Sequence, residues 1–138
     1  MRRFTLVTGL FTAMASMCLH AQTMDMRGSI PFDFRIGSAA FPSGEYLIHN
    51  DTRGVLSVRQ VDGQHQGGVF MTVGDDHPNT QTLKGTLLFN RYGDTYFLAK
   101  VWTPDSETAR ATIKTAREKE LASHLGLPQN TTVALRTK

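Results

Sequence analysis

Residues 87–102, LLFNRYGDTYFLAKVW, constrain the fold of this chain more than any other stretch because they have the pattern of a β-hairpin. Two runs rich in apolar and aromatic residues flank Gly93-Asp94, and glycine at the first central position favours a tight type II′ turn. Strands joined by two residues pair symmetrically about them, so the turn also predicts the register. The predicted cross-strand pairs are Arg91–Tyr96, Asn90–Phe97, Phe89–Leu98, Leu88–Ala99, Leu87–Lys100 and Thr86–Val101.

Both faces of this hairpin carry large apolar groups. We therefore expect it to lie centrally, with one face on the core and the other partly covered. The segments before it alternate apolar and polar residues, as half-buried strands do, for example at Phe32, Phe34 and Ile36. Pro31 lacks a backbone donor, so the first of these strands should lie at an edge or bend there. Further strands are expected at 45–48, 55–61, 67–73 and 131–136, joined mostly by short polar turns.

The period of the pattern changes near the C-terminus. Thr115-x-x-Glu118 is a capping box, which predicts a helix over residues 116–125, and Gly126 and Pro128 then end it. The predicted fold class is all-β: an antiparallel meander of about seven strands, forming a barrel or a sandwich. One short C-terminal helix should pack on this sheet or plug it.

The first 21 residues have the features of a signal peptide. Arg2 and Arg3 precede an apolar run over residues 4–19, and Ala21 ends a plausible cleavage site. The expected products are a leader, 1–21, and a single all-β domain, 22–138, located in the periplasm or outside the cell. An uncleaved anchor and lipidation at Cys18 are alternatives, but Met17 disfavours the second. Cleavage would remove the one cysteine, so the mature chain would have no disulfide and no transmembrane segment.

The charge balance gives no case for nucleic-acid binding. Removing Arg2 and Arg3 from fifteen basic residues leaves thirteen against twelve acidic ones, a net charge of about +1. From Ser106 onward the chain is mildly basic. This end could contact anionic lipid or glycan, but a solvated face is the favoured interpretation.

The sequence contains few groups arranged for catalysis or metal binding. Asp75-Asp76-His77 could contribute metal ligands, but adjacent residues rarely converge on one ion, and the triplet also suits a solvated loop. No G-x-S-x-G motif is present, and a carboxylate pair such as Asp33 and Glu45 is common in β proteins. We therefore expect no enzymatic activity and no cofactor.

Ten aromatic residues lie in the expected mature chain, more than a small sheet strictly needs. They could simply fill the core, line an apolar pocket inside a barrel, or form an exposed patch for a partner or carbohydrate. The candidate binding residues lie on the central hairpin, and Arg91 is the polar contact among them. They are Phe89, Arg91, Tyr96, Phe97 and Trp102.

Several short motifs occur in an informative order between residues 30 and 122. They are Phe34-x-Ile36-Gly37, Phe41-Pro42-x-Gly44-x-Tyr46, Leu88-Phe89-x-Arg91-Tyr92-Gly93, Phe97-Leu98-x-x-Val101-Trp102 and Glu118-Lys119-Glu120-Leu121. In these motifs the chain resembles a group of small exported bacterial β-rich proteins for which no function is established. The resemblance implies an exported all-β domain with a short helix, and it supplies no catalytic residue.

Three functions remain open on these grounds. The first is a non-enzymatic exported or envelope-associated protein that binds a small apolar ligand or a partner through the aromatic hairpin. The second is a structural or interaction protein with a filled core, acting through a sheet edge or the basic helical end. The third, a small hydrolase, is disfavoured because no nucleophile has an activating context.

Overall fold

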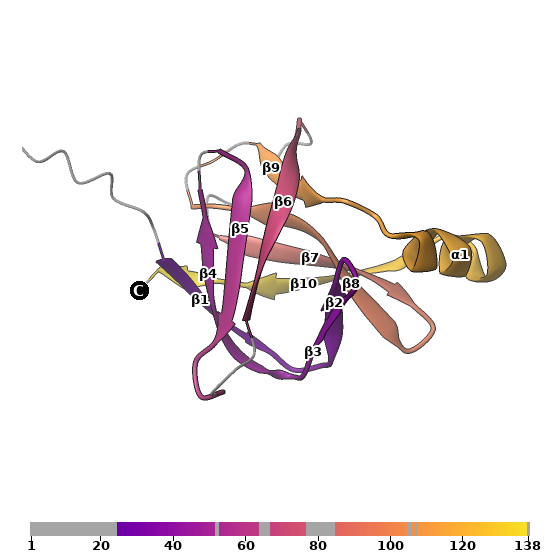
Figure 1. The fold of residues 1–138 in the computed structure, drawn as a ribbon, viewed down its shortest axis with the longest axis horizontal. Coiled ribbons are helices and arrows are strands. Elements are labelled where there is room, and N and C mark those ends of the chain that lie inside the picture. The colour runs from indigo at the N-terminus through magenta and orange to yellow at the C-terminus, as the bar shows by residue number, and fades with distance from the viewer. Residues whose placement is uncertain are drawn as a thin grey trace, which may run out of the picture.

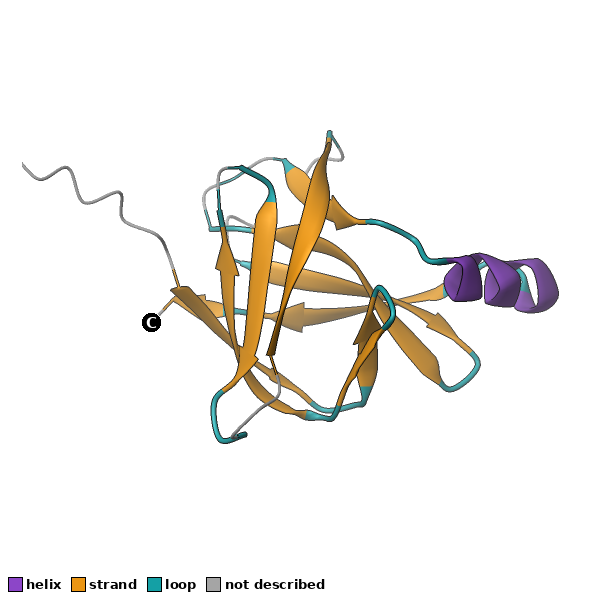
Figure 2. Cartoon of the chain, viewed as in Figure 1, coloured by secondary structure: helices purple, strands orange, loops and turns teal. Residues whose placement is uncertain are grey.

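The computed structural model describes residues 25–51, 53–63, 67–76, 85–104, 106 and 108–137, which form a mainly β structure with one short helix (Figure 2). The predicted leader, 1–21, lies outside the described residues. The helix α1 is Ala116–Leu125. The strands are β1 (Asp25–Ile30), β2 (Phe34–Ile36), β3 (Ala39–Phe41), β4 (Gly44–Asn50), β5 (Val55–Gln60), β6 (Gly67–Asp75), β7 (Thr86–Tyr92), β8 (Thr95–Trp102), β9 (Ala109–Thr112), β10 (Gln129–Ala134) and β11 (Arg136–Thr137).

These eleven strands exceed the seven that the sequence predicted, and the difference has local causes. The chain leaves β1 just before Pro31, so the expected first strand is split into β1 and β2. Two short strands, β3 and β9, lie in stretches without strand periodicity. The expected last strand is interrupted at Leu135, which separates β10 from β11.

The strands form one sheet in the order β10-β7-β8-β9-β6-β5-β4-β1-β11, with β2 and β3 branching from β8. Neighbouring strands in the runs β4-β5-β6 and β7-β8-β9 are antiparallel, as a meander predicts. The exception is β2, which pairs in parallel with β8 by placing Phe34 opposite Tyr96. The parallel pair brings an N-terminal segment against the central hairpin (Figure 1).

The last segment of the chain forms both ends of this order. β10 pairs with β7, and β11 pairs with β1, although only Leu135 separates the two strands. Leu135 is buried, and its backbone N–H donates to the Gly85 carbonyl over 2.8 Å. A Cβ atom at Gly28 would lie 2.5 Å from Leu135 Cδ2, and one at Gly85 would lie 3.1 Å from Leu135 Cβ. Two glycines therefore make room for this side chain between β10 and β11.

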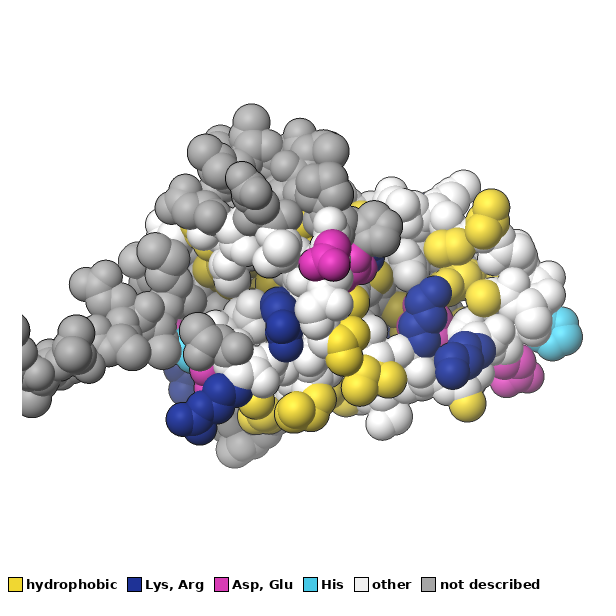
Figure 3. Space-filling model, turned by 90° about the horizontal axis from the view of Figure 1, so that it is seen from above, with side chains coloured by type: hydrophobic (Ala, Val, Ile, Leu, Met, Phe, Trp, Pro, Cys, Tyr) yellow, Lys and Arg dark blue, Asp and Glu magenta, His cyan; other side chains and the backbone are white. Residues whose placement is uncertain are grey.

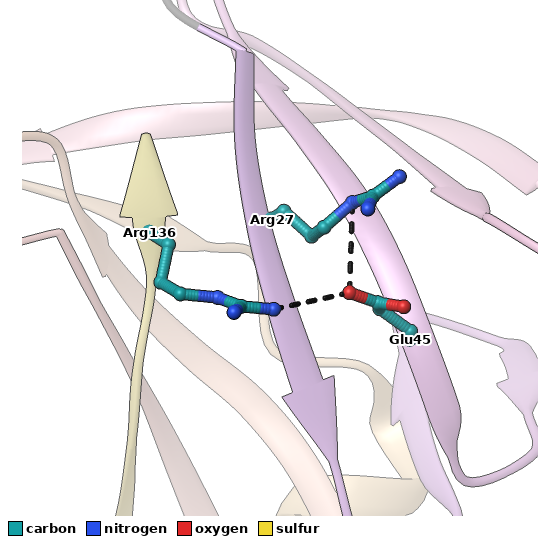
Figure 4. A network of polar contacts seen from close by, with 3 residues as sticks. All are labelled: Arg27, Glu45 and Arg136. Atoms are coloured by element: carbon teal, nitrogen blue, oxygen red, sulfur yellow. Dashed lines mark hydrogen bonds and ion pairs between the residues drawn. The ribbon is translucent and has the colours of Figure 1, made fainter. Parts of the chain in front are cut away.

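A surface ion network reinforces the β11–β1–β4 side of this junction (Figure 4). Glu45 Oε1 on β4 lies 3.5 Å from Arg27 Nε on β1 and 3.2 Å from Arg136 Nη2 on β11. The network spans three adjacent strands. Because Arg136 is largely exposed, water and salt screen its charge, and packing around Leu135 contributes more to stability.

The central hairpin is confirmed, but its predicted register holds only near the turn. Gly93 has φ of +60°, and the pairs Arg91–Tyr96, Asn90–Phe97 and Phe89–Leu98 form as predicted. The register then shifts, so the predicted pairs Leu88–Ala99, Leu87–Lys100 and Thr86–Val101 are wrong. The structure instead pairs Leu88 with Lys100, Leu87 with Val101 and Thr86 with Trp102.

The shift is a β-bulge, and its physical reason is burial. In the unshifted register, Lys100 would lie opposite Leu87, which is fully buried in the core. One extra residue in β8 turns Lys100 to the other face and places Val101 in the core opposite Leu87. An uncompensated buried ammonium is thereby avoided.

The helix begins and ends where the sequence predicted. Thr115 is the N-cap, and its hydroxyl accepts from the Glu118 backbone N–H over 3.3 Å, while Gly126 ends the helix with φ of +80°. The Glu118 carboxylate contacts Asn90 and Tyr92 on β7. α1 packs on the outside of the sheet beyond the hairpin (Figure 1). The described residues form no helix that is long and apolar enough to cross a membrane.

We predict that Leu135→Ala lowers the free energy of unfolding by about 2–5 kcal/mol, since it leaves a cavity between β10 and β11. Urea unfolding followed by circular dichroism measures this change. The matched control is Leu127→Ala, because Leu127 is 95% exposed and should change stability by less than about 0.5 kcal/mol. Equal small effects of the two substitutions would contradict the proposed role of Leu135.

Candidate functional site

The five candidate binding residues of the hairpin lie on two opposite faces. Phe89, Arg91 and Tyr96 share the face toward the core, as their cross-strand pairing requires. Phe97 and Trp102 lie on the other face, and both are buried. The structure therefore does not bring the five side chains together into one surface.

Aromatic rings of the chain itself cover the core face of the hairpin. Phe32 stacks on Tyr96 with ring centroids 3.8 Å apart, and its ring edge meets Phe89 at 4.9 Å. Phe34 also contacts Phe89 at 5.5 Å. Arg91 lies at the rim, with its guanidinium carbon 5.4 Å from the Tyr96 ring centroid. The core face of the hairpin is thus packed against the protein's own aromatic rings.

A shallow hollow of about 410 Å³ lies beside this aromatic cluster. It is open to solvent between the β2–β3 hairpin and the tip of the β7–β8 hairpin, and Asp33, Arg35 and Tyr96 are among its lining residues. Of the five candidate residues, only Tyr96 lines it. The hollow opens at the hairpin tips, and its floor includes Phe34 and Phe41, which belong to the buried core.

A second cavity, about 340 Å³ in volume, lies on the opposite face of the hairpin, next to the first turn of α1. Its lining is mostly polar and comes from β6, β7, β8, β9, β10 and the N-terminal end of α1. The residues are Asp75, Leu88, Asn90, Ala99, Lys100, Ala111, Thr112, Lys114, Glu118 and Asn130. No sequence motif marked this site because its residues come from six separate segments.

Glu118 and Tyr92 interact next to this cavity. Glu118 Oε1 accepts from Asn90 Nδ2 over 3.3 Å and from the Tyr92 hydroxyl over 3.5 Å. Burial raises the pKa of the Tyr92 phenol above its usual value, and the Glu118 carboxylate raises it further by opposing the phenolate charge. The capping-box glutamate thus contributes a buried carboxylate to the outer face of the sheet.

The candidate metal ligands are not brought together in the described residues. Asp75 Oδ2 lies 2.8 Å from Lys100 Nζ, Asp76 is exposed, and His77 lies outside the described residues. No group of three or more His, Cys, Asp or Glu side chains in the described part of the chain is placed to hold a metal ion.

The candidate catalytic carboxylates have separate structural partners. Asp33 Oδ1 accepts from the Ser43 backbone N–H over 2.8 Å, whereas Glu45 forms the ion network described above. Among the described residues, one imidazole–carboxylate contact joins His49 Nδ1 to Asp25 Oδ1 at 2.9 Å, on the surface of β1 and β4. Ser57 on β5 lies opposite His49 in the strand register, but in the described part of the chain no hydrogen bond joins the Ser57 hydroxyl to the imidazole.

The outward face of β6 is strongly apolar. Val69, Met71 and Val73 are 70%, 61% and 53% exposed, and Ile113 nearby is 61% exposed. Between Met71 and Ile113 lies a cavity of about 300 Å³, which Phe70 and Ile36 also line. Figure 3 shows hydrophobic side chains gathered in a band on the surface of the molecule. We call Val69, Met71, Val73 and Ile113 the β6 surface.

The sequence showed that Val69, Met71 and Val73 share one side of a strand, but not that this side faces solvent. Their spacing is the same as that of a core-facing strand, so periodicity alone gave no signal. Comparison with protein-family models, with curated proteins and with solved structures gave no match to this chain.

We predict that the stability of the protein falls as the pH rises above about 10, in part because of Tyr92. The raised pKa means that the folded state favours the neutral phenol of Tyr92. The stability that this phenol contributes is therefore complete below pH 10 and is lost as the pH rises through the pKa of Tyr92 in the folded state. Urea unfolding of wild type and Tyr92→Phe at pH 8 and pH 11 measures this effect. The variant should lose less stability between the two pH values, and an equal loss would contradict the assignment.

Proposed function

We propose that this is an exported, non-enzymatic protein that binds another protein through the β6 surface. The observation that carries the proposal is the exposure of Val69, Met71 and Val73 at alternate positions of one strand. Exposed apolar groups that are contiguous and lie on regular structure are typical of interaction sites in water-exposed proteins. Burying a side chain such as Met71 in an interface contributes about 1.5–3 kcal/mol.

The backbone of β6 favours an extended segment as the partner. Residues 72–75 of β6 pair with β9, whereas residues 67–71 pair only with β5 among the described strands. One edge of residues 67–71 is thus free of a strand within the described chain. A partner segment in extended conformation could add to this edge and place alternate apolar side chains against Met71 and Ile113.

The aromatic hairpin gives less support to the small apolar ligand that the sequence also allowed. The Phe32 ring already covers Phe89 and Tyr96 on the core face of the hairpin. Among the described residues, the helical end exposes two large apolar side chains, Leu125 and Leu127, whereas the β6 surface exposes four. A protein partner at β6 is therefore the better-supported function.

The pairing of the last segment supports a further proposal, that the sheet closes as a barrel. β10 and β11 stand at the two ends of the strand order and are separated by one residue. A sheet whose end strands are joined in this way has to curl strongly. In such a barrel the strand pairing would be interrupted between the edges of β3 and β6. Phe41 of β3 and Phe70 of β6, whose ring centroids lie 5.9 Å apart, would bridge this gap.

The proposal of export rests on the sequence alone. Arg2 and Arg3, the apolar run of residues 4–19 and the small residue Ala21 support a cleaved leader and a periplasmic or extracellular location. We predict that protein recovered from the periplasm or medium of its host begins at Gln22, as measured by intact mass and N-terminal peptide sequencing. Recovery of the full-length chain from the cytoplasm alone would contradict export.

We predict that a photo-crosslinking residue at Met71 captures a protein of the cell envelope in the native host, and that the same residue at Val69 captures the same protein. The matched control is Thr132, an exposed strand position on β10. The captured region of the partner, prepared as a peptide, should bind the wild-type chain at least tenfold more tightly than Met71→Lys, a difference of about 1.4 kcal/mol. Thr132→Lys should bind like wild type.

Three outcomes would contradict this function. One is equal capture at Thr132 and Met71, which indicates non-specific contact. The second is unchanged peptide affinity in Met71→Lys. The third is capture of only a second copy of this chain, which would make the surface a homodimer interface and not a site for a different protein.

A further inference from the structure

The mostly polar cavity between the sheet and the first turn of α1 is lined by a buried carboxylate, that of Glu118, which has no ion-pair partner among the described residues. Glu118 is only 4% exposed and Asn90 only 8%, although both are polar and both line the cavity. Glu118 Oε1 receives two long hydrogen bonds from neutral donors, Asn90 and Tyr92. Among the described residues, no cation lies within ion-pair distance of this carboxylate. Buried carboxylates are costly unless they are paired, so this group is suited to a cationic ligand.

The other charges of the cavity narrow the class of ligand. Lys100 and Asp75 neutralise each other, with Nζ and Oδ2 2.8 Å apart. Lys114 lines the same cavity as Glu118, but the two side chains form no ion pair with each other. The cavity is therefore lined by one carboxylate, Glu118, and one ammonium, Lys114, that form no direct ion pair with each other. A ligand that matches both carries a positive and a negative group.

Size and the remaining lining set the dimensions of such a ligand. The volume of about 340 Å³ lies at the lower end of small-molecule pockets. The side-chain amides of Asn90 and Asn130 offer hydrogen bonds, and Leu88, Ala99 and Ala111 offer apolar contact. These groups suit a short molecule with polar ends and a small apolar part.

The geometry points to a binding site for a small zwitterion of amino-acid size in this cavity. The ammonium group of the ligand binds the Glu118 carboxylate, and its carboxylate binds Lys114. The site adjoins the β6 surface, because Thr112 and Lys114 line both this cavity and the one beside Met71, but it does not depend on the function proposed above. No bond is made or broken in it.

The test is a titration of the mature chain with the twenty standard L-amino acids, each added singly up to about 10 mM and followed by ¹⁵N-resolved NMR. At least one should bind saturably and shift the side-chain amide signals of Asn90 and Asn130. Ethylamine and propionate, which carry only one of the two charges, should bind at least tenfold more weakly than that amino acid. The absence of saturable binding by all twenty would overturn the proposal, as would ethylamine binding as tightly as the amino acid.

Charge variants then locate the site. Glu118→Gln keeps the shape and the acceptor oxygen but removes the charge, and it should weaken binding of the same amino acid at least tenfold. Glu120→Gln is the matched control on the exposed side of α1 and should leave affinity unchanged. Lys114→Met should also weaken binding at least tenfold. Because Lys114 is exposed, this variant tests the site even if Glu118→Gln does not fold. Wild-type affinity in Lys114→Met, or in folded Glu118→Gln, would overturn the assignment.

Discussion

The double pairing of residues 129–137 is the constraint on which the rest of the structure depends. β10 binds β7 and β11 binds β1, so the strands at the two ends of the sheet order are held by one short segment of backbone. Leu135 lies at the change of partner, and Gly28 and Gly85 have no side chains that would exclude it. The ion network of Glu45 with Arg27 and Arg136 lies outside this contact and adds modestly to it.

This constraint explains why the central hairpin has two different environments. With β10 on one side of β7 and β8 on the other, the core face of the hairpin is packed with aromatic rings. Its opposite face is covered in part by α1, whose Glu118 contacts Asn90 and Tyr92. The bulge in β8 keeps these environments distinct, because it turns Lys100 toward the polar face and Val101 toward the core. The extra residue in β8 thus lets the same strand place Val101 in the apolar core and Lys100 in the polar cavity.

Local chemistry predicted the local structure of this chain well. The turn at Gly93-Asp94, three cross-strand pairs beside it and both ends of the helix follow from glycine, capping and periodicity. Long-range pairing was not predictable in this way. Nothing near β2 indicates that it pairs in parallel with β8, and nothing near Leu135 indicates a change of partner. The β6 surface and the polar cavity were not predictable for the same reason: β6 exposes its apolar side, and Glu118 is buried, because of where distant segments lie. The sequence does contain a signal of the bulge. Leu98 and Val101 are both apolar but three residues apart, whereas a regular strand places residues on one face at even spacings.

The most direct test of this account is the set of cross-strand NOEs made by the last segment in a dilute NMR sample of the mature chain. The account predicts contacts between the backbones of Thr132 and Leu88 and between those of Arg136 and Arg27 in the same folded species. Contacts to β7 without contacts to β1, or the reverse, would contradict it, because the sheet would then have two separate ends.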